Sequence, residues 1–313
     1  MGVDLDRMRE SCERDQWCVD DFDWSGTPVS LSREQEEQVC SYYVNMSYIE
    51  RLAGALFLSL SERVDDPRLV AIFESFHTDE LRHSQAAAKL ADYFDRHHYR
   101  IYTPNIPMLR FMPHFVNAID SLNPAFAMSF ILGGELILDM ALLRGLNQYV
   151  DDPLSRAVVE KINQDESRHL AMDLYMTEYF ARIGRRDASK DNPWLGSDFW
   201  GVLAWGPGFF GEVFFRPMQV LDPTQEQMRA VINRLRRFYD RASVAANPAV
   251  QEFKGVVNFL ETPVGAQLGG ALEVGIRTLF GIDLGFTRAA STEAVYGRDA
   301  DERSRTVPAL ASV

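Results

Sequence analysis

Cysteine is scarce in this sequence. Among 313 residues there are three, Cys12, Cys18 and Cys40, and none of them forms a Cys-x-x-Cys pair or has the spacing of zinc ligands. A small, odd number of cysteines in a chain of this length predicts free thiols in a reducing compartment. The first residues also lack a basic stretch followed by an apolar run, so we expect no secretory signal and a cytoplasmic protein.

Positive charge is outnumbered by negative charge. The chain has 32 lysines and arginines against 45 aspartates and glutamates, which gives a net charge of -13. Nucleic-acid binding needs a basic surface, and an acidic chain is repelled by anionic lipid, so we expect neither nucleic acid nor a membrane as a partner. The length and the hydrophobic fraction of 46% suffice for one large globular core or two modest ones.

An uninterrupted hydrophobic run of membrane-spanning length is also missing. Residues 193–221 come nearest, being rich in aromatic residues and glycine, but Pro207, Glu212 and Arg216 interrupt them. This composition favours buried helices that cover a core or form a dimer face over a membrane span. We therefore expect additional helices here and a homodimer.

What the sequence does contain is a repeated acidic motif. Asp-Glu-x-Arg-His at 79–83 returns at 165–169, and in a helix the glutamate and the histidine three residues later share one face. About 30 residues upstream of each motif, a single glutamate stands within an apolar helical stretch: Glu50 before the first and Glu135 before the second. The chain thus offers four carboxylates and two imidazoles from four predicted helices.

The repeat extends beyond the motif, with a constant offset of 86 residues. Asp-Asp-Pro at 65–67 returns at 151–153, and Tyr-Phe at 93–94 returns at 179–180. Aspartate followed by proline begins a helix, so two helix pairs related by a pseudo-two-fold axis are predicted.

The predicted organisation follows from these starts, with a further helix beginning at Ser32. We expect an all-α fold, a ferritin-like four-helix bundle with additional C-terminal helices. Its segments are an irregular N-terminal arm at 1–30, the bundle at 31–185 with a third helix at 124–149 and a crossover loop at 99–113, helices packed on the bundle at 186–285, and a flexible tail at 286–313.

The motif residues predict a metal centre. Four buried carboxylates without a cation would repel one another and cost several kcal/mol each in desolvation. Carboxylate oxygens with a few imidazole nitrogens suit iron, and bridging carboxylates hold two ions about 3.5–4 Å apart. The candidate ligands, which would act in catalysis through the metals, are Glu50, Glu80, His83, Glu135, Glu166 and His169.

The chain also contains an internal control. Glu74 and His77 have the same Glu-x-x-His spacing, yet Glu160 and Asn163 stand at the repeat offset, so this pair has no counterpart. We expect Glu74 to be solvated and His77 to be a packed, hydrogen-bonded residue beside the site rather than a ligand. On the fourth helix, Asp173 and Tyr175 are expected to be core or supporting residues, not catalysts.

At these residues the sequence resembles the ferritin-like di-iron carboxylate oxygenase superfamily, over about residues 31–182. Its layout is most similar to the p-aminobenzoate N-oxygenase-like group, although Ile162 stands where that group has a third metal-binding histidine. The resemblance implies two iron ions, O2 as co-substrate and an external electron donor such as a reductase or ferredoxin. It also implies that Asp79 and Asp165 orient the ligand histidines.

The expected function is therefore that of a di-iron monooxygenase acting on a small organic substrate, by N-oxygenation, hydroxylation or desaturation. Two alternatives stay open. One is an iron-binding or storage protein without an organic substrate. The other is a radical-generating subunit, which needs a redox-active tyrosine near the metals; ribonucleotide reductase small subunits have one seven residues after the first motif glutamate, where Ala87 stands here.

Overall fold

A computed structural model describes residues 3–121, 149–183 and 197–211, with isolated positions at 128–129, 131–132 and 134–135 and a few between 237 and 278. Every regular element in these residues is helical, as predicted. The elements are α1 (Leu5–Arg14), η1 (Val19–Asp21), α2 (Arg33–Ser61), α3 (Pro67–Phe94), α4 (Ile106–Ser121), α7 (Pro153–Ile183) and α8 (Ser197–Phe210). All of them belong to one compact unit, residues 1–254, and residues 255–313 form a second unit.

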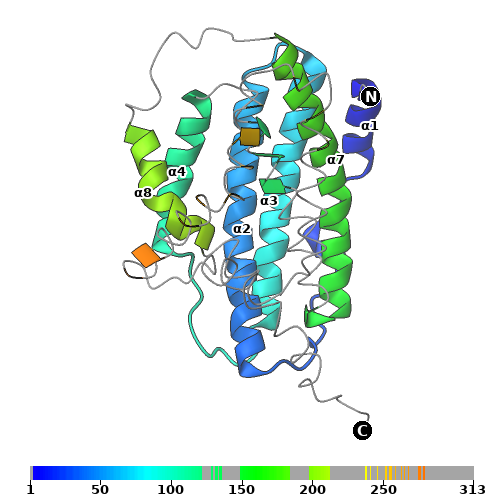
Figure 1. Ribbon diagram of the computed structural model, residues 1–313. Helices are drawn as coiled ribbons and strands as arrows, with labels where there is room; N and C mark the ends of the chain where they lie inside the picture. Colours follow the sequence, from blue (N-terminus) through cyan, green and yellow to red (C-terminus); the bar gives the residue numbers. More distant parts are fainter. Residues whose placement is uncertain are drawn as a thin grey trace, which may run out of the picture. The chain divides into compact units, whose positions relative to one another are not determined.

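The three long helices α2, α3 and α7 lie side by side (Figure 1), and α3 contacts both of the others. Their facing sides are apolar, and fully burying one large apolar side chain contributes about 1.5–3 kcal/mol. The largest side chains buried between them include Phe57, Phe73, Phe76, Leu69, Ile72 and Leu90. The bundle is therefore stabilised mainly by the apolar stripes that the sequence displays at helical spacing.

The predicted helix starts are confirmed at three positions. Ser32 Oγ accepts a hydrogen bond from the Gln35 amide (3.2 Å), and the Gln35 side chain accepts one from the Ser32 amide (3.0 Å). Asp66 caps α3, and Asp152 Oδ1 accepts from the Ser155 amide at 2.9 Å. Each cap satisfies amides that the first helical turn leaves without a partner.

The prediction of a wholly irregular arm at 1–30 is wrong, because residues 5–14 form α1. Asp4 caps this helix by accepting from the Arg7 amide at 3.2 Å. Leu5 and Cys12 are buried, and α1 packs against α3. The helix is short, and packing against α3 stabilises it in addition to its local pattern.

The prediction of a crossover loop throughout 99–113 is also wrong, because α4 begins at Ile106. Asn105 Oδ1 accepts from the Met108 amide at 2.7 Å, which caps the helix. Pro107 stands in the first turn, where a missing amide hydrogen costs nothing, and Pro113 is tolerated within the helix.

Helices α4 and α8 pack closely together. The rings of Phe111 and Phe209 stack with centroids 4.2 Å apart, and His114 Nδ1 lies 2.9 Å from Asp198 Oδ1. A Cβ at Gly201 would collide with the His114 ring, so only glycine permits this approach. Helix α8 is one of the predicted additional helices; most of 186–285, all of 286–313 and most of the predicted helix at 124–149 lie outside the described residues.

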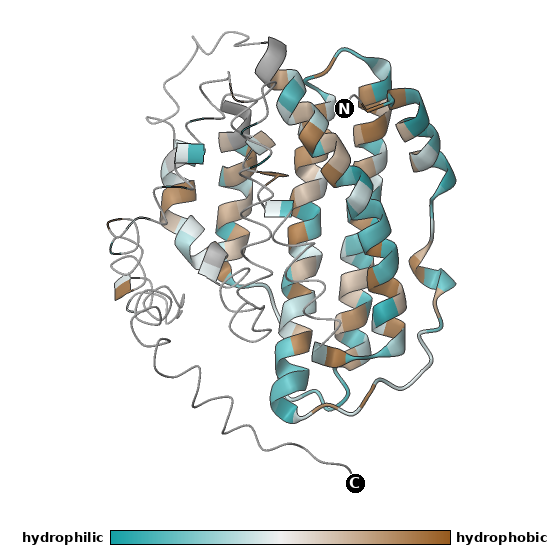
Figure 2. Cartoon of the chain, turned by 45° about the vertical axis from the view of Figure 1, so that its right-hand side comes forward, coloured by the Kyte–Doolittle hydropathy of each residue, from teal (hydrophilic) through white to brown (hydrophobic). Residues whose placement is uncertain are grey.

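Hydrophilic and hydrophobic residues are interspersed along the helices (Figure 2), and none of the helices in the described residues is long and apolar enough to span a membrane. The three cysteines are free, with Cys12 and Cys40 buried and Cys18 exposed, as the prediction of free thiols requires.

Candidate metal centre

The structure brings five of the six predicted ligands together in the bundle interior. Glu50 is on α2, Glu80 and His83 are on α3, and Glu166 and His169 are on α7; each is at most 5% exposed. Glu135 stands at a described helical position and is half-buried.

Glu80 and Glu166 each lie between the two imidazole rings. His83 Nδ1 is 3.1 Å from Glu166 Oε1 and 3.7 Å from Glu80 Oε2. His169 Nδ1 is 3.0 Å from Glu80 Oε1 and 3.2 Å from Glu166 Oε2. Each carboxylate therefore presents one oxygen to each histidine, which is the placement that a bridging carboxylate requires.

Glu50 completes a cluster on the His83 side. One donor atom from each of Glu50, Glu80, His83 and Glu166 lies within 4.8 Å of the others. All four residues are buried, so the cluster is not a chance gathering of exposed acidic groups.

The donor atoms at the centre lack hydrogen-bond partners among the residues described. They are Glu50 Oε1, both oxygens of Glu80, His83 Nδ1 and His169 Nδ1. Buried polar atoms are normally satisfied, and several together point to a cation that is bound in the functional protein. Carboxylate oxygens and imidazole nitrogens are ligands of iron and manganese, so these residues fit a two-metal centre.

The pKa shifts reveal crowding of negative charge. Burial, and then the charge of Glu80, raise the pKa of Glu50 well above its usual value. Burial and the charges of Glu166 and Glu80 do the same to the pKa of Glu135. Burial also opposes ionisation of Glu80, but the two histidines outweigh it and lower the pKa of Glu80. Without metal, protons on Glu50 and Glu135 therefore neutralise part of the negative charge. In the metal-loaded protein, two divalent ions would neutralise it instead.

The histidines face the cluster with Nδ1 because aspartates hold their Nε2 atoms. His83 Nε2 lies 3.0 Å from Asp165 Oδ2, and His169 Nε2 lies 3.5 Å from Asp79 Oδ2. An ionised carboxylate can only accept a hydrogen bond, so Nε2 carries a proton. When the ring loses its second proton to bind a metal, the Nδ1 lone pair points to the glutamates. Each aspartate serves the histidine of the other motif.

Two arginines that the sequence analysis did not assign neutralise these aspartates. Arg168 Nη2 lies 2.6 Å from Asp165 Oδ1 and 3.3 Å from Asp79 Oδ2. Arg82 Nη1 lies 3.1 Å from Asp79 Oδ1 and 3.6 Å from Asp165 Oδ2. Both arginines belong to the repeated motif, so the repeat itself contained the signal.

The segment after α1 covers this polar network, which the sequence analysis also missed. Trp17 Nε1 donates to Asp165 Oδ2 at 2.7 Å, and the Trp17 ring stacks on His83 with centroids 6.3 Å apart. The Arg82 guanidinium lies 5.3 Å from the centre of the same ring, and Gln16 hydrogen-bonds to Arg82 and Asp79. Residues 16 and 17 are outside the repeat, so no pattern indicated them.

His77 lies one turn before Glu80 on α3, and its Nδ1 pairs with the backbone of α2. Its Nδ1 is 2.8 Å from the carbonyl oxygen of Gly54 on α2. A Cβ at Gly54 would lie 3.2 Å from Glu80 Cβ and 3.3 Å from His77 Nδ1, so glycine permits the close approach of α2 and α3 here. Glu74 is exposed, as predicted.

Further along α7, Asp173 is completely buried and neither of its carboxylate oxygens has a hydrogen-bond partner in the described part of the chain. Burial raises the pKa of Asp173 to about 8; His169 opposes this shift, and Glu166 and Glu80 add to it. Tyr175 is half-buried and stacks on Tyr179, and Ile162 is buried with a side chain that cannot coordinate a metal.

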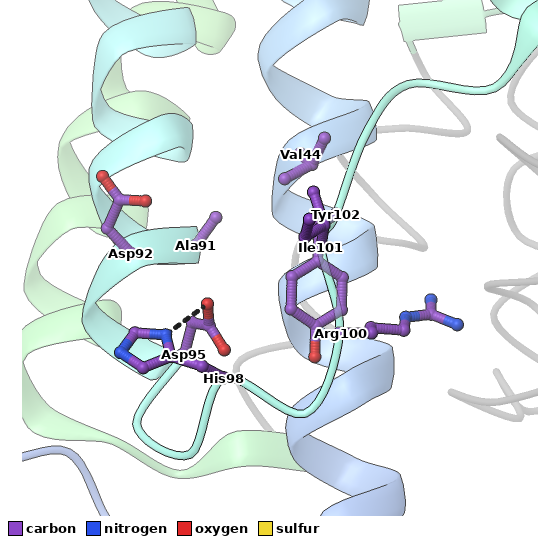
Figure 3. A pocket seen from close by; sticks show the side chains of 8 residues that line it. All are labelled: Val44, Ala91, Asp92, Asp95, His98, Arg100, Ile101 and Tyr102. Carbon is purple, nitrogen blue, oxygen red and sulfur yellow. Dashed lines mark hydrogen bonds and ion pairs between the residues drawn. The ribbon is translucent and has the colours of Figure 1, made fainter.

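A cavity of about 370 Å³ lies elsewhere, between α2, the end of α3 and the loop that follows it (Figure 3). Asp95 and His98 form an ion pair at its edge, with Oδ2 and Nδ1 3.0 Å apart. None of the candidate ligands lines it, so it is separate from the metal centre.

No protein-family model and no curated protein matches this sequence. Among solved structures, an R2-like ligand-binding oxidase mutant with an anaerobically reconstituted Mn/Fe cofactor is 15% identical and has a TM-score of 0.49, covering 75% of this chain and 92% of that one. The same type of mutant with an aerobically reconstituted Mn/Fe cofactor is 16% identical, with a TM-score of 0.49 and coverage of 75% and 96%. An R2-like oxidase with a metal cofactor after photoconversion is 14% identical, with a TM-score of 0.49 and coverage of 80% and 90%.

None of these three structures is a p-aminobenzoate N-oxygenase. In the described residues, two Glu-x-x-His helices face each other and a glutamate on a third helix joins them. The chain has an all-α fold of the ferritin-like kind.

Proposed function

We propose that this protein holds two metal ions in the bundle and uses them to oxidise a small organic molecule with O2. The observation that carries the proposal is the position of Glu80 and Glu166, each with one oxygen directed at His83 and the other at His169. An ion-pair network would satisfy those atoms with cations of the chain, but the described arginines nearby, Arg82 and Arg168, bind the aspartates behind the histidines instead.

Each residue has a distinct task in this proposal. His83 and Glu50 would hold one ion, His169 and Glu135 the other, and Glu80 and Glu166 would bridge them. Two redox-active ions held in this way supply the activation of O2 and the removal of electrons from the substrate. Asp165 and Asp79 keep the proton on Nε2 of the two rings, so that Nδ1 stays available as a donor.

Aromatic side chains exclude water from one side of the centre. Phe76 lies 4.2 Å and Phe57 lies 5.1 Å from His169, measured between ring centroids, and both phenylalanines are fully buried. A dry, apolar wall protects reactive oxygen chemistry from side reactions and favours an apolar small-molecule substrate over a charged one.

Iron is the metal that we propose for both positions, and manganese is the other metal that this ligand set suits. If the reaction inserts one oxygen atom, O2, the substrate C–H or N–H group, two electrons and two protons give the hydroxylated substrate and one water. The two electrons then come from an external donor, and we propose a reductase or ferredoxin for this task. N-oxygenation, hydroxylation and desaturation are all open to such a centre.

Metal analysis tests the proposal. The protein, loaded anaerobically with Fe²⁺ or Mn²⁺ and freed of excess metal, should retain about two ions per chain and consume O2 when iron is bound. A His83→Ala, His169→Ala double variant should retain almost none, and the matched control Glu74→Ala, in the unpaired Glu-x-x-His sequence, should retain two. Retention of a single zinc ion, or of no metal, refutes the proposal; continued uptake far beyond two irons per chain indicates iron storage instead.

A further inference from the structure

Asp173 is a buried carboxylate that is not among the six predicted metal ligands. It is 0% exposed, and both of its oxygens lack a hydrogen-bond partner among the described residues. Thr177 is hydrogen-bonded to the backbone carbonyl of residue 173, which leaves the carboxylate itself unsatisfied. An isolated buried carboxylate is costly, and the functional protein needs a partner for it.

The position of Asp173 on α7 places it beside the metal centre. It follows Glu166 by seven residues and His169 by four, so all three side chains lie on one face of the helix. The electrostatic neighbours of Asp173 are His169, Glu166 and Glu80, and Asp173 in turn acts on Glu135. The nearest of these along the helix is His169, one turn before Asp173 on α7.

The internal repeat is broken at this position. The offset of 86 residues that relates the two motifs maps Asp173 onto Ala87, which is 1% exposed on α3. The His83 side of the centre therefore has a methyl group where the His169 side has a carboxylate. Among the described residues, the cations near the centre do not neutralise Asp173 either, because Arg82 and Arg168 pair with Asp79 and Asp165.

We propose that Asp173 is a further ligand for the metal on the His169 side, so that the two metal positions differ by one carboxylate. This inference rests on the proposed two-metal centre and adds to it. A position with an extra anionic oxygen binds a hard divalent cation more tightly than its counterpart, so the two positions should fill in order, the His169 side first.

The test measures metal affinity rather than activity, in the full-length protein. Co²⁺ is titrated anaerobically into wild type, Asp173→Asn and the control Thr177→Val, with a competing chelator to resolve the two dissociation constants. Asparagine keeps the volume of aspartate but removes its charge. The tighter site of Asp173→Asn should weaken at least tenfold, the other site should change less than twofold, and Thr177→Val should resemble wild type. In a His169→Ala background, Asp173→Asn should leave the remaining site within twofold.

Thermal unfolding of the same proteins separates ligation from a structural role. Because Asp173→Asn removes an unsatisfied buried carboxylate, the metal-free variant should melt at a higher temperature than metal-free wild type, whereas the Co²⁺-loaded variant should gain less from the metal. Two unchanged dissociation constants, beside a wild type that binds two ions, overturn this inference alone. Equal weakening of both sites with a lower melting temperature also overturns it, because Asp173 is then a structural residue. A wild type that binds fewer than two ions overturns the proposed function as well.

Discussion

The imidazole of His83 is held by Asp165, which comes 82 residues later in the chain: Nε2 and Oδ2 are 3.0 Å apart. The reciprocal pair, His169 and Asp79, has a separation of 3.5 Å. Each histidine is thus oriented by the aspartate of the opposite motif, on the opposite helix. The two halves of the centre depend on each other through these hydrogen bonds.

Replacing Asp165 with asparagine should weaken the metal on the His83 side, although Asp165 adjoins Glu166. Partners of ligand histidines typically contribute about 10–100-fold to metal affinity, so a loss in this range is expected. Asp79→Asn should produce the corresponding loss on the His169 side. Titration with Co²⁺ in His83→Ala and His169→Ala backgrounds distinguishes the sides. Asp92→Asn, at an exposed position of α3, is the control. A loss confined to the side of the substituted motif would contradict the crossed arrangement.

His77→Ala should leave both metals bound, because His77 pairs with the Gly54 carbonyl rather than with a ligand. His83→Ala and His169→Ala should each abolish binding of at least one ion. The metal content of the three purified variants, measured after iron loading, decides the matter. If His77→Ala empties the site as fully as His83→Ala does, His77 is a ligand and the two-histidine site is wrong.

Gly54→Ala should destabilise the bundle and distort the centre. The added Cβ meets Glu80 Cβ at 3.2 Å and His77 Nδ1 at 3.3 Å, closer than ordinary contact, so α2 and α3 must separate slightly. Forcing extra volume into a packed interior typically costs about 1–3 kcal/mol, which chemical denaturation of the metal-free protein would measure. Gly26→Ala is the control, since its Cβ would meet only the Tyr93 hydroxyl at 3.9 Å. Equal stability of the two variants would show that the helices are not in close contact at Gly54.

The metal-free protein should lose stability as the pH rises from about 6.5 to about 8.5. The folded-state pKa values of Glu50, Glu135 and Asp173 are raised, the last to about 8, so the folded state retains protons that the unfolded chain releases above about pH 4. The pKa values of His83 and His169 are also raised, despite burial, by the carboxylates around them. Their stabilisation is complete below about pH 6.5 and is lost as the pH rises through their folded-state values.

Glu80 and Asp165 have the opposite effect, an increase of stability with pH, but only in the acidic range. The pKa values of Glu80 and Asp165 are lowered by the histidines against the effect of burial, so their contribution is present above about pH 4 and is lost below it. Melting temperatures of chelator-treated protein at pH 6.5 and 8.5 test the prediction, and metal-loaded protein, whose ligands are already deprotonated, should show a smaller fall. A melting temperature of metal-free protein that increases over this interval would be incompatible with the shifts.

The parts of the fold that sequence alone predicted are those with local causes. Ser32, Asp66 and Asp152 cap their helices through atoms two or three residues away, so their effect is visible in a short window. Helix α4 escaped prediction because Pro107 and Pro113 are typical of loops, whereas its packing on α8 through Phe111 and Phe209 involves residues about 100 positions apart.

The candidate ligands could be predicted because the chain repeats them, and a repeat converts one weak Glu-x-x-His signal into a specific one. Helical spacing establishes that Glu80 and His83 share a face, but it does not identify the helix opposite. The pairing of each aspartate with the histidine of the opposite motif could therefore be established only from the structure. No sequence pattern indicated the role of Trp17, because its hydrogen-bond partner Asp165 lies 148 residues further along the chain.

The crossed aspartates also constrain how the two halves can evolve. A single helix pair carries two glutamates and a histidine, but its aspartate orients the histidine of the other pair, so one copy of the repeat is functionally incomplete. Two copies, fused or associated about a two-fold axis, complete each other. We therefore expect substitutions at Asp79 to be selected together with those at His169, and substitutions at Asp165 with those at His83. Among homologous sequences, position 79 should covary with position 169 and position 165 with position 83, more strongly than neighbouring positions within one motif covary.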